Sequence, residues 1–129
     1  MPWTEVFMYR AADGTIPVLV WLSLLARRDP SAARKCRRQI KLLQAQGFEL
    51  RRPHADYLRD AVYELRVRHG RVHYRLLYSF CGRNTVVVSN AFSKEGEVPD
   101  FEIETAVRRR LDVEADPDTH AVREWMIDE

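Results

Sequence analysis

The sequence has few of the residues that crosslink a fold or interrupt it: two cysteines, five glycines and six prolines in 129 residues. Cys36 and Cys81 lack the spacing of metal ligands, and unpaired thiols fit a reducing cytoplasm. The most apolar run, residues 16–25, is far shorter than the roughly 20 residues that cross a bilayer. It follows no basic leader, so we expect a cytoplasmic protein with no signal peptide and no membrane partner.

Three motifs typical of common enzyme classes are also missing from the sequence. There is no glycine-rich phosphate loop, no His/Cys metal cluster and no G-x-S-x-G nucleophile elbow. We therefore expect neither a metal nor another cofactor. The hydrophobic content of 46% is nevertheless enough for one compact domain with a real core.

Charge is unevenly distributed along the chain, although the net charge is only +2. Residues 27–75 carry a charge of +9 and residues 76–129 a charge of −6. A basic block of this kind is typical of a protein that binds a polyanion. It is equally compatible with a solvated helix face, so the sequence alone leaves both interpretations open.

The alternation of apolar and polar residues predicts an antiparallel β-meander in the middle of the chain. The predicted strands cover residues 3–9, 63–68, 72–80 and 85–88. His69-Gly70 has the composition of a two-residue hairpin turn, and residues 81–84 supply the next turn. The first strand, residues 3–9, is expected to pair with this meander.

Helical patterns lie on either side of the meander. The predicted helices cover residues 17–27, 32–46 and 100–111, with an irregular connector over residues 48–59. The first two form a helical hairpin, in which Pro17 opens one helix and Gly47 ends the other. Together with the meander they indicate an α+β fold.

The last residues, 112–129, form an acidic C-terminal extension. Asp118 is placed to cap a short helix that contains Val122, Trp125 and Met126. An apolar turn at the end of the chain indicates docking, either on this protein or on a partner.

Arg66 and Arg75 are the most unusual residues of the meander because each puts a permanent charge in the middle of a strand. A turn at His69-Gly70 would pair Arg66 with His73, which places Arg75 diagonally across on the same face. Two guanidinium groups this close repel each other unless an anion lies between them, and phosphate is the anion that they match best. Salt bridges to Glu64 or to the acidic C-terminal extension are the alternative explanation.

Further candidate site residues surround this pair. Lys94 follows the third strand of the meander and can reach the same face, while His54 and His73 are the nearby groups that titrate near neutral pH. Phe92 is either a core residue or a platform for an RNA base. The second helix exposes a cationic stripe that contains Arg34, Arg37, Arg38 and Lys41.

These residue types suit RNA cleavage, which needs no metal. The 2′-OH attacks the adjacent phosphate when a base removes its proton, an acid protonates the leaving 5′-oxygen, and cations stabilise the phosphorane. Arginines and a lysine held on a sheet supply the cations.

The same residues resemble a known family. The stretches that carry the resemblance are Pro53-His54, Tyr63-Glu64-Leu65-Arg66, His73-Tyr74-Arg75-Leu76-Leu77-Tyr78, Phe92-Ser93-Lys94-Glu95, and Pro99 with Glu102-Ile103 and Ala106. In this order and spacing the sequence is similar to RelE/ParE-superfamily toxins over about residues 3–111, and most similar to their phage-derived, HigB-like branch. That branch commonly has His-Gly where Asn90-Ala91 stands here.

The resemblance implies a toxin of a type II toxin–antitoxin pair. The implied fold is RelE-like, with an N-terminal helical hairpin packed on a twisted antiparallel sheet and a C-terminal helix, over a domain of residues 1–111. The implied activity is that of a ribosome-dependent mRNA endonuclease (an mRNA interferase). The implied partners are the ribosome, mRNA and a cognate antitoxin with a helix–turn–helix, through which alone operator DNA would be bound.

Residue by residue, the resemblance makes Arg66 and Arg75 the arginines that bind phosphate and stabilise the transition state. Lys94 becomes a further cationic or acid group and His54 an acid–base candidate. The basic helix, residues 34–41, would contact ribosomal RNA. Two alternatives stay open: a ParE-like inhibitor of DNA gyrase, and a catalytically inactive module that only binds a partner.

Overall fold

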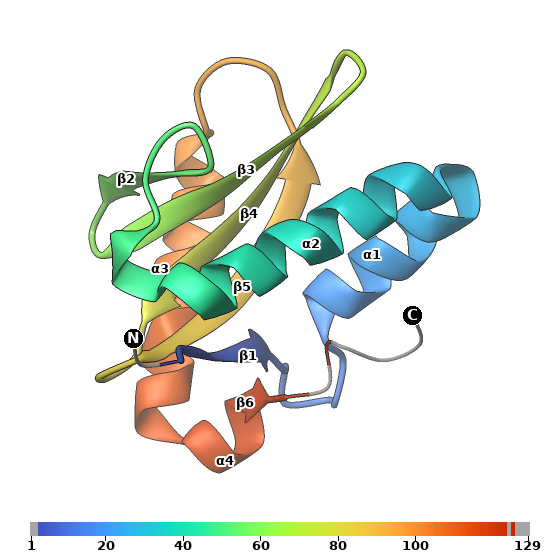
Figure 1. Ribbon diagram of the computed structural model, residues 1–129. Helices are drawn as coiled ribbons and strands as arrows, with labels where there is room; N and C mark the ends of the chain where they lie inside the picture. The colour runs from blue at the N-terminus through green and yellow to red at the C-terminus, as the bar shows by residue number, and fades with distance from the viewer. Residues whose placement is uncertain (1–2, 124, 126–129) are drawn as a thin grey trace.

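The computed structural model describes residues 3–123 and 125, and its elements form three layers (Figure 1). A helical hairpin of α1 (Pro17–Arg28) and α2 (Pro30–Gln46) covers one face of a six-stranded sheet, and α3 (Asp100–Ala115) covers the other. The predicted α+β fold, with a helical hairpin packed on a sheet and a C-terminal helix, is confirmed.

Specific residues mark where the two helices of the hairpin begin and end. Pro17 opens α1, and the Asp29 carboxylate accepts a hydrogen bond of 3.1 Å from the backbone N–H of Ala32 at the start of α2. Gly47 ends α2 with a φ of 51°. A Cβ at this position would lie 2.2 Å from the Thr4 hydroxyl oxygen, so only glycine fits.

The sheet has the order β2-β3-β4-β5-β1-β6. Its strands are β1 (Glu5–Tyr9), β2 (Ala55–Arg59), β3 (Val62–His69), β4 (Val72–Phe80), β5 (Thr85–Ser93) and β6 (Ala121–Val122). The meander of β3, β4 and β5 is antiparallel as predicted, but β1 runs parallel to β5. The sheet is therefore mixed, because the chain returns through the hairpin before it enters the meander.

Two strands were missed by the sequence pattern, β2 and the short β6 near the end of the chain. The connector expected to be irregular over residues 48–59 contains a single turn of 3-10 helix, η1 (Gly47–Glu49), followed by β2, which pairs antiparallel with β3. β2 is an outer strand with mostly half-buried or exposed residues, so it has little of the apolar alternation that predicts a strand. Pro53 has no backbone N–H to donate. Because it precedes β2, the ladder between β2 and β3 loses no hydrogen bond.

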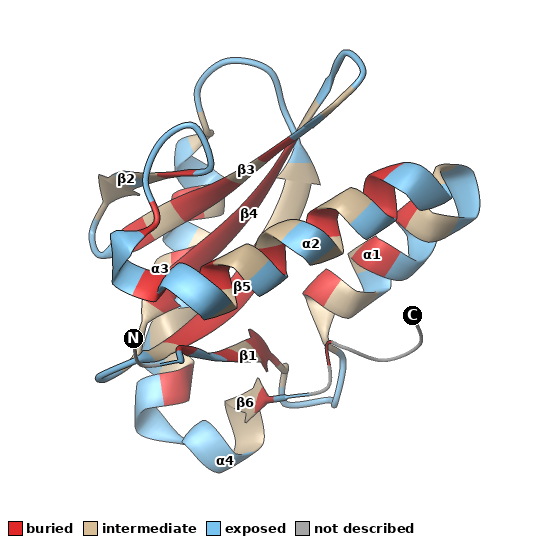
Figure 2. Cartoon of the chain, in the orientation of Figure 1, coloured by how far each residue is buried: buried red, intermediate tan, exposed pale blue. Residues whose placement is uncertain are grey.

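The sheet separates a large hydrophobic core on its hairpin side from two smaller clusters on its α3 side (Figure 2). The larger core lies under the hairpin and joins residues such as Leu22 and Ile40 to Leu65 and Leu76 of the sheet. One of the two smaller clusters lies under α3 and contains Val62, Leu77, Ile103 and Ala106. β4 is buried on both faces, which fixes the central strand rigidly between the two helical layers.

The C-terminal extension packs on the sheet. The predicted end of α3 at Leu111 was wrong, because the helix continues to Ala115 and buries Val113 against Tyr9 and Val87. A short α4 (Pro117–His120) follows, capped by Asp116 instead of Asp118.

Val122 was expected in a helix but lies in β6, which pairs antiparallel with β1. Trp125 is 3% exposed, and its indole N–H donates a 3.0 Å hydrogen bond to the carbonyl of Val6. Met126 lies outside the described residues. Docking on this protein, one of the two options that the sequence left open, is thus observed for Val122 and Trp125.

Among the residues that the structure describes, no helix has the length and apolar character needed to span a bilayer.

Replacing Trp125 tests how strongly the extension holds the sheet. We expect Trp125→Ala to lower the free energy of unfolding by about 3 kcal/mol, because it removes a buried ring and leaves the Val6 carbonyl without its donor. Urea denaturation followed by far-UV circular dichroism measures this. Trp3→Ala is the matched control, since Trp3 is 62% exposed and should change stability by less than about 0.5 kcal/mol. If Trp125→Ala lowers the free energy of unfolding no more than Trp3→Ala does, the contact of Trp125 with the sheet contributes no measurable stability.

Candidate functional site

The two strand arginines face the α3 side of the sheet and lie directly opposite each other. The predicted register was wrong by two residues, because the turn consists of Gly70 and Arg71, and Arg66 pairs with Arg75 instead of His73. Gly70 has a φ of 63°, the conformation that a type II′ hairpin turn requires at its first central position. A shift of two residues keeps each side chain on its face, so both arginines remain on the same side.

Arg75 is buried, and both of its terminal nitrogens are hydrogen-bonded. Its side chain is 7% exposed; one terminal nitrogen donates a 2.8 Å bond to Glu64 Oε1, and the other donates a 2.9 Å bond to the carbonyl of Gly96. Glu64 is equally buried and lies on the neighbouring strand. The Glu64 salt bridge that the sequence left as an alternative is therefore present, and it holds Arg75 in one orientation.

Arg66 is the accessible member of the pair. Its side chain is 37% exposed, and its Nε lies 3.9 Å from the second carboxylate oxygen of Glu64. One carboxylate thus lies beside two guanidinium groups, which leaves a local charge of +1. The position that the sequence assigned to an external anion between the arginines is taken by Glu64, and the outer side of Arg66 remains open to solvent.

These three side chains line an open hollow of about 420 Å³ between β2, β3 and the loop of residues 94–99. Arg52 and Asp56 form part of its rim and are paired at 2.7 Å. The hydrogen bond from Arg52 lowers the pKa of the Asp56 carboxyl below its usual range, so Asp56 is ionised at neutral pH. The hollow is thus lined by charged groups of both signs next to apolar residues such as Leu58 and Val98.

Three other predicted site residues lie near this hollow without lining it. His73 and Phe92 are on the same face of the sheet, paired with Arg68 and Arg75 respectively. Phe92 is half-buried against the small core under α3, so it serves packing first. Lys94 is exposed just beyond β5, and its backbone N–H donates to the carbonyl of His73.

The remaining predicted residues lie elsewhere. The His54 ring is 3.2 Å from the side-chain nitrogen of Gln39 on α2, and it does not line the hollow. His54 does neighbour Arg66 through the backbone, because its carbonyl accepts the Arg66 N–H at 2.7 Å.

The cationic residues of α2 are also separated from the arginine pair. Arg34, Arg38 and Lys41 are exposed and Arg37 is half-buried, all on the helix that covers the opposite face of the sheet. The protein therefore presents one cationic surface on the hairpin and a second cationic site beside α3.

Sequence reasoning missed three contributors to the site: Arg52, Asp56 and the carbonyl of Gly96. Asp56 was missed because β2 was expected to be irregular, which hid its pairing with Glu64, and Arg52 was missed with it because Arg52 reaches the site through its salt bridge to Asp56. No side-chain pattern signals a backbone carbonyl such as that of Gly96.

Comparison with known proteins places this site in a family. The family model described as "Phage derived protein Gp49-like (DUF891)" matches residues 24–111. The chain belongs to this family. The match includes α2, the whole β2–β5 sheet and the loop over Arg75, and it ends where the C-terminal extension begins. No curated protein matches the chain. The RelE-type resemblance therefore holds at the level of a Gp49-like, RelE/toxin-like family.

Asn90, which stands in this Gp49-like chain where the HigB-like branch commonly has histidine, serves as a link between layers. Its side-chain nitrogen donates to the backbone carbonyl and the carboxylate of Glu102 on α3, at 3.2 and 2.9 Å. Its side-chain oxygen accepts a 2.6 Å bond from the Ser89 hydroxyl. Asn90 is therefore occupied in holding α3 against β5.

Removing the charge of Glu64 tests its place between the arginines. We expect Glu64→Gln to lower the free energy of unfolding by about 3 kcal/mol or more, because it leaves the buried Arg75 without a counter-charge. Inorganic sulfate should stabilise this variant more than the unchanged protein, since the exposed side of Arg66 then carries a charge that an anion can neutralise. Thermal unfolding with and without sulfate measures both effects.

Glu97→Gln is the control for Glu64→Gln, because Glu97 lines the same hollow but is exposed. It should change stability by less than about 0.5 kcal/mol. If Glu64→Gln and Glu97→Gln have the same free energy of unfolding, Glu64 does not stabilise the arginine pair.

Proposed function

We propose that this Gp49-like protein is the toxin of a type II toxin–antitoxin pair, of the HigB-like kind, and that it cleaves mRNA on the ribosome. The observation that carries the proposal is the pair of arginines fixed face to face around Glu64, with Arg66 open to an incoming phosphate. The membership in a RelE/toxin-like family supports it.

The arrangement suits metal-independent cleavage. The 2′-oxygen forms a bond to the adjacent phosphorus as a base takes its proton, and the bond to the 5′-oxygen breaks as that oxygen receives a proton. Negative charge accumulates on the phosphoryl oxygens, where a fixed guanidinium stabilises it. Arg66 is the group that contacts these oxygens, while the salt bridge between Arg75 and Glu64 fixes the charges around it.

The acid–base groups are proposed from the same face. His73 lies two residues before Arg75 on β4, and exposed Lys94 starts the loop beside it. The His54 ring lies against α2 instead, so its catalytic part in the proposal is weaker than the resemblance suggested. His73 and Lys94 are therefore the first candidates for the base and the acid.

The two cationic surfaces match a ribosome-dependent reaction. Arg34, Arg38 and Lys41 are exposed on α2, which covers the face of the sheet opposite the arginine pair. A protein that binds ribosomal RNA through α2 would thus present Arg66 outward to a second RNA, the mRNA. The cognate antitoxin, a helix–turn–helix protein encoded nearby, belongs to the same proposal, as does a cytoplasmic location.

A second candidate function is inhibition of DNA gyrase, and one observation favours it. Both terminal nitrogens of Arg75 already donate to Glu64 and Gly96, and the side chain is only 7% exposed, so little of this guanidinium is accessible to a substrate. A protein that only binds a target needs no such group. The two functions are separated by whether translation stops first or the DNA-damage response begins first.

The Arg66→Gln variant tests the nuclease. Mapping of mRNA 5′ ends after brief induction in living cells should show cuts within translated frames, and the variant should reduce cutting roughly 100- to 1,000-fold because it removes the cation at the phosphorane.

Arg71→Gln is the matched control for this experiment, since it removes an exposed arginine from the turn of the same β-hairpin. It should cut normally. Growth arrest without cuts would indicate gyrase or another target instead of mRNA. If neither growth arrest nor cuts were seen, only the binding-module interpretation would remain.

Neutralising α2 tests the contact with the ribosome. We expect replacement of Arg34, Arg38 and Lys41 by glutamine to weaken ribosome association and to flatten its salt dependence, because each lost phosphate contact removes roughly 0.7–0.9 from the slope of log affinity against log salt. Co-sedimentation at several salt concentrations measures the slope.

The control for the α2 variant replaces three exposed arginines on other elements, Arg71, Arg83 and Arg108. It removes the same charge and should leave the slope nearly unchanged. Equal slopes in the two triple variants would show that α2 only solvates the domain.

A further inference from the structure

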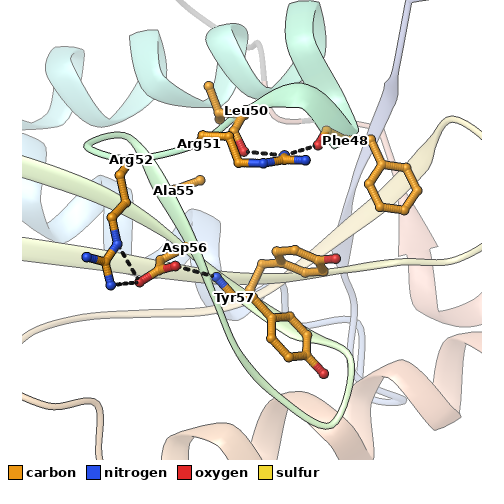
Figure 3. A pocket seen from close by; sticks show the side chains of 8 residues that line it. Phe48, Leu50, Arg51, Arg52, Ala55, Asp56 and Tyr57 are labelled. Carbon is orange, nitrogen blue, oxygen red and sulfur yellow. Dashed lines mark hydrogen bonds and ion pairs between the residues drawn. The ribbon is translucent and has the colours of Figure 1, made fainter.

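A second hollow, lined by aromatic residues, lies at the edge of the sheet next to the arginine site (Figure 3). It has a volume of about 540 Å³, within the range of small-ligand pockets. Phe48 of η1 and Tyr57 of β2 stand on its wall, and Arg51 and Arg52 lie on its rim. Neither the arginine pair nor the family match accounts for it.

The rings of this aromatic hollow are arranged to receive another flat ring. Phe48 stacks on Phe80 with centroids 4.3 Å apart and planes 13° from parallel, yet it is 64% exposed. One face of Phe48 is therefore covered and the other is open. Tyr57 is 52% exposed and is fixed by an edge contact with Tyr63, at 5.0 Å between centroids. Two exposed rings that line the same hollow, each held by a second aromatic ring, offer surfaces for stacking.

The charges around the platform select a polyanion. Arg51 donates to the backbone carbonyls of Phe48 and Leu50, which holds its guanidinium beside the rings. Arg52 is bonded to Asp56 but remains 73% exposed, so its outer side is open to solvent. Two guanidinium groups against one carboxylate leave the rim positive.

The aromatic hollow adjoins the arginine hollow, and the two share lining residues. Arg52, Asp56 and Tyr57 line both, because β2 is an outer strand whose residues alternate between the two faces of the sheet. Tyr57 faces the hairpin side with Tyr63, whereas Asp56 faces the α3 side with Glu64. A flexible chain that reaches Arg66 can thus pass around β2 into the aromatic hollow.

We propose that the aromatic hollow holds a base of single-stranded RNA, stacked on Phe48 and Tyr57, with its phosphate on Arg52. This inference rests on the proposed function and identifies where the RNA next to Arg66 binds. Stacking tolerates every base, so the hollow contributes affinity and position without a strong sequence preference.

The test uses a short single-stranded 2′-O-methyl RNA, which binds but cannot undergo attack by a 2′-OH. Fluorescence polarisation gives the affinity of the full chain and of Phe48→Leu and Tyr57→Leu, which keep apolar volume but lose the flat ring. Each substitution should weaken binding roughly five- to 100-fold. Removing one base from the RNA should weaken binding to the unchanged protein by a similar factor, and should weaken binding to Phe48→Leu no further.

Phe101→Leu is the matched control, because Phe101 is also a largely exposed ring but lies on α3. It should bind as the unchanged protein does. Thermal unfolding of each variant verifies that the fold is retained. Unchanged affinity in folded Phe48→Leu and Tyr57→Leu, or no binding of the RNA by the unchanged protein at low salt, would overturn the proposal.

These outcomes are separate from those of the nuclease proposal. RNA binding that depends on the rings, without mRNA cuts in cells, would support the proposed RNA site and contradict the proposed nuclease activity. Cuts in cells together with ring-independent binding would support the nuclease and remove the hollow. Loss of antitoxin binding in Phe48→Leu, with RNA affinity unchanged, would assign the hollow to a protein partner instead.

Discussion

One buried carboxylate determines how this site is built. Glu64 lies between two guanidinium groups that the register of β3 and β4 brings face to face, and it alone separates their charges within the sheet. A buried charge without a partner costs several kcal/mol, so Glu64, Arg66 and Arg75 constrain one another. The bond from Arg75 to Gly96 extends this constraint to the loop before α3. The position of that loop therefore depends on a contact made inside the sheet.

Much of this arrangement follows from patterns within the sequence. The meander, both hairpin helices and the shared face of Arg66 and Arg75 were predictable, because side chains alternate with a period of two and a two-residue shift preserves each face. The exact pairing was not, since Gly70 permits either turn position. β2 was missed because an outer strand has only weak alternation, and its loss hid Arg52 and Asp56.

The acidic second half of the chain has a structural role that composition could not specify. Its carboxylates bind neighbours within the fold: Asp112 accepts from the Tyr9 hydroxyl at 2.7 Å, and Glu102 accepts from Asn90. Tyr9 has a raised pKa, first because of burial and then because of its bond to Asp112. Asp112 and Glu102 thus hold α3 against the sheet. The distribution of charge along the sequence indicated a polyanion partner, but only the fold shows where that charge is exposed.

The short β6 also affects how the molecule behaves in a crowded solution. An unpaired strand edge is a template on which other chains can align and aggregate. β6 covers part of β1 and ends that side of the sheet, within the described residues, in a strand of two residues. The opposite edge, β2, has five residues and is followed by Asp60 and Ala61 with positive φ, which turn the chain away at once. The two-residue β6 and the turn directly after β2 thus limit the length of unpaired strand at the two borders of the sheet.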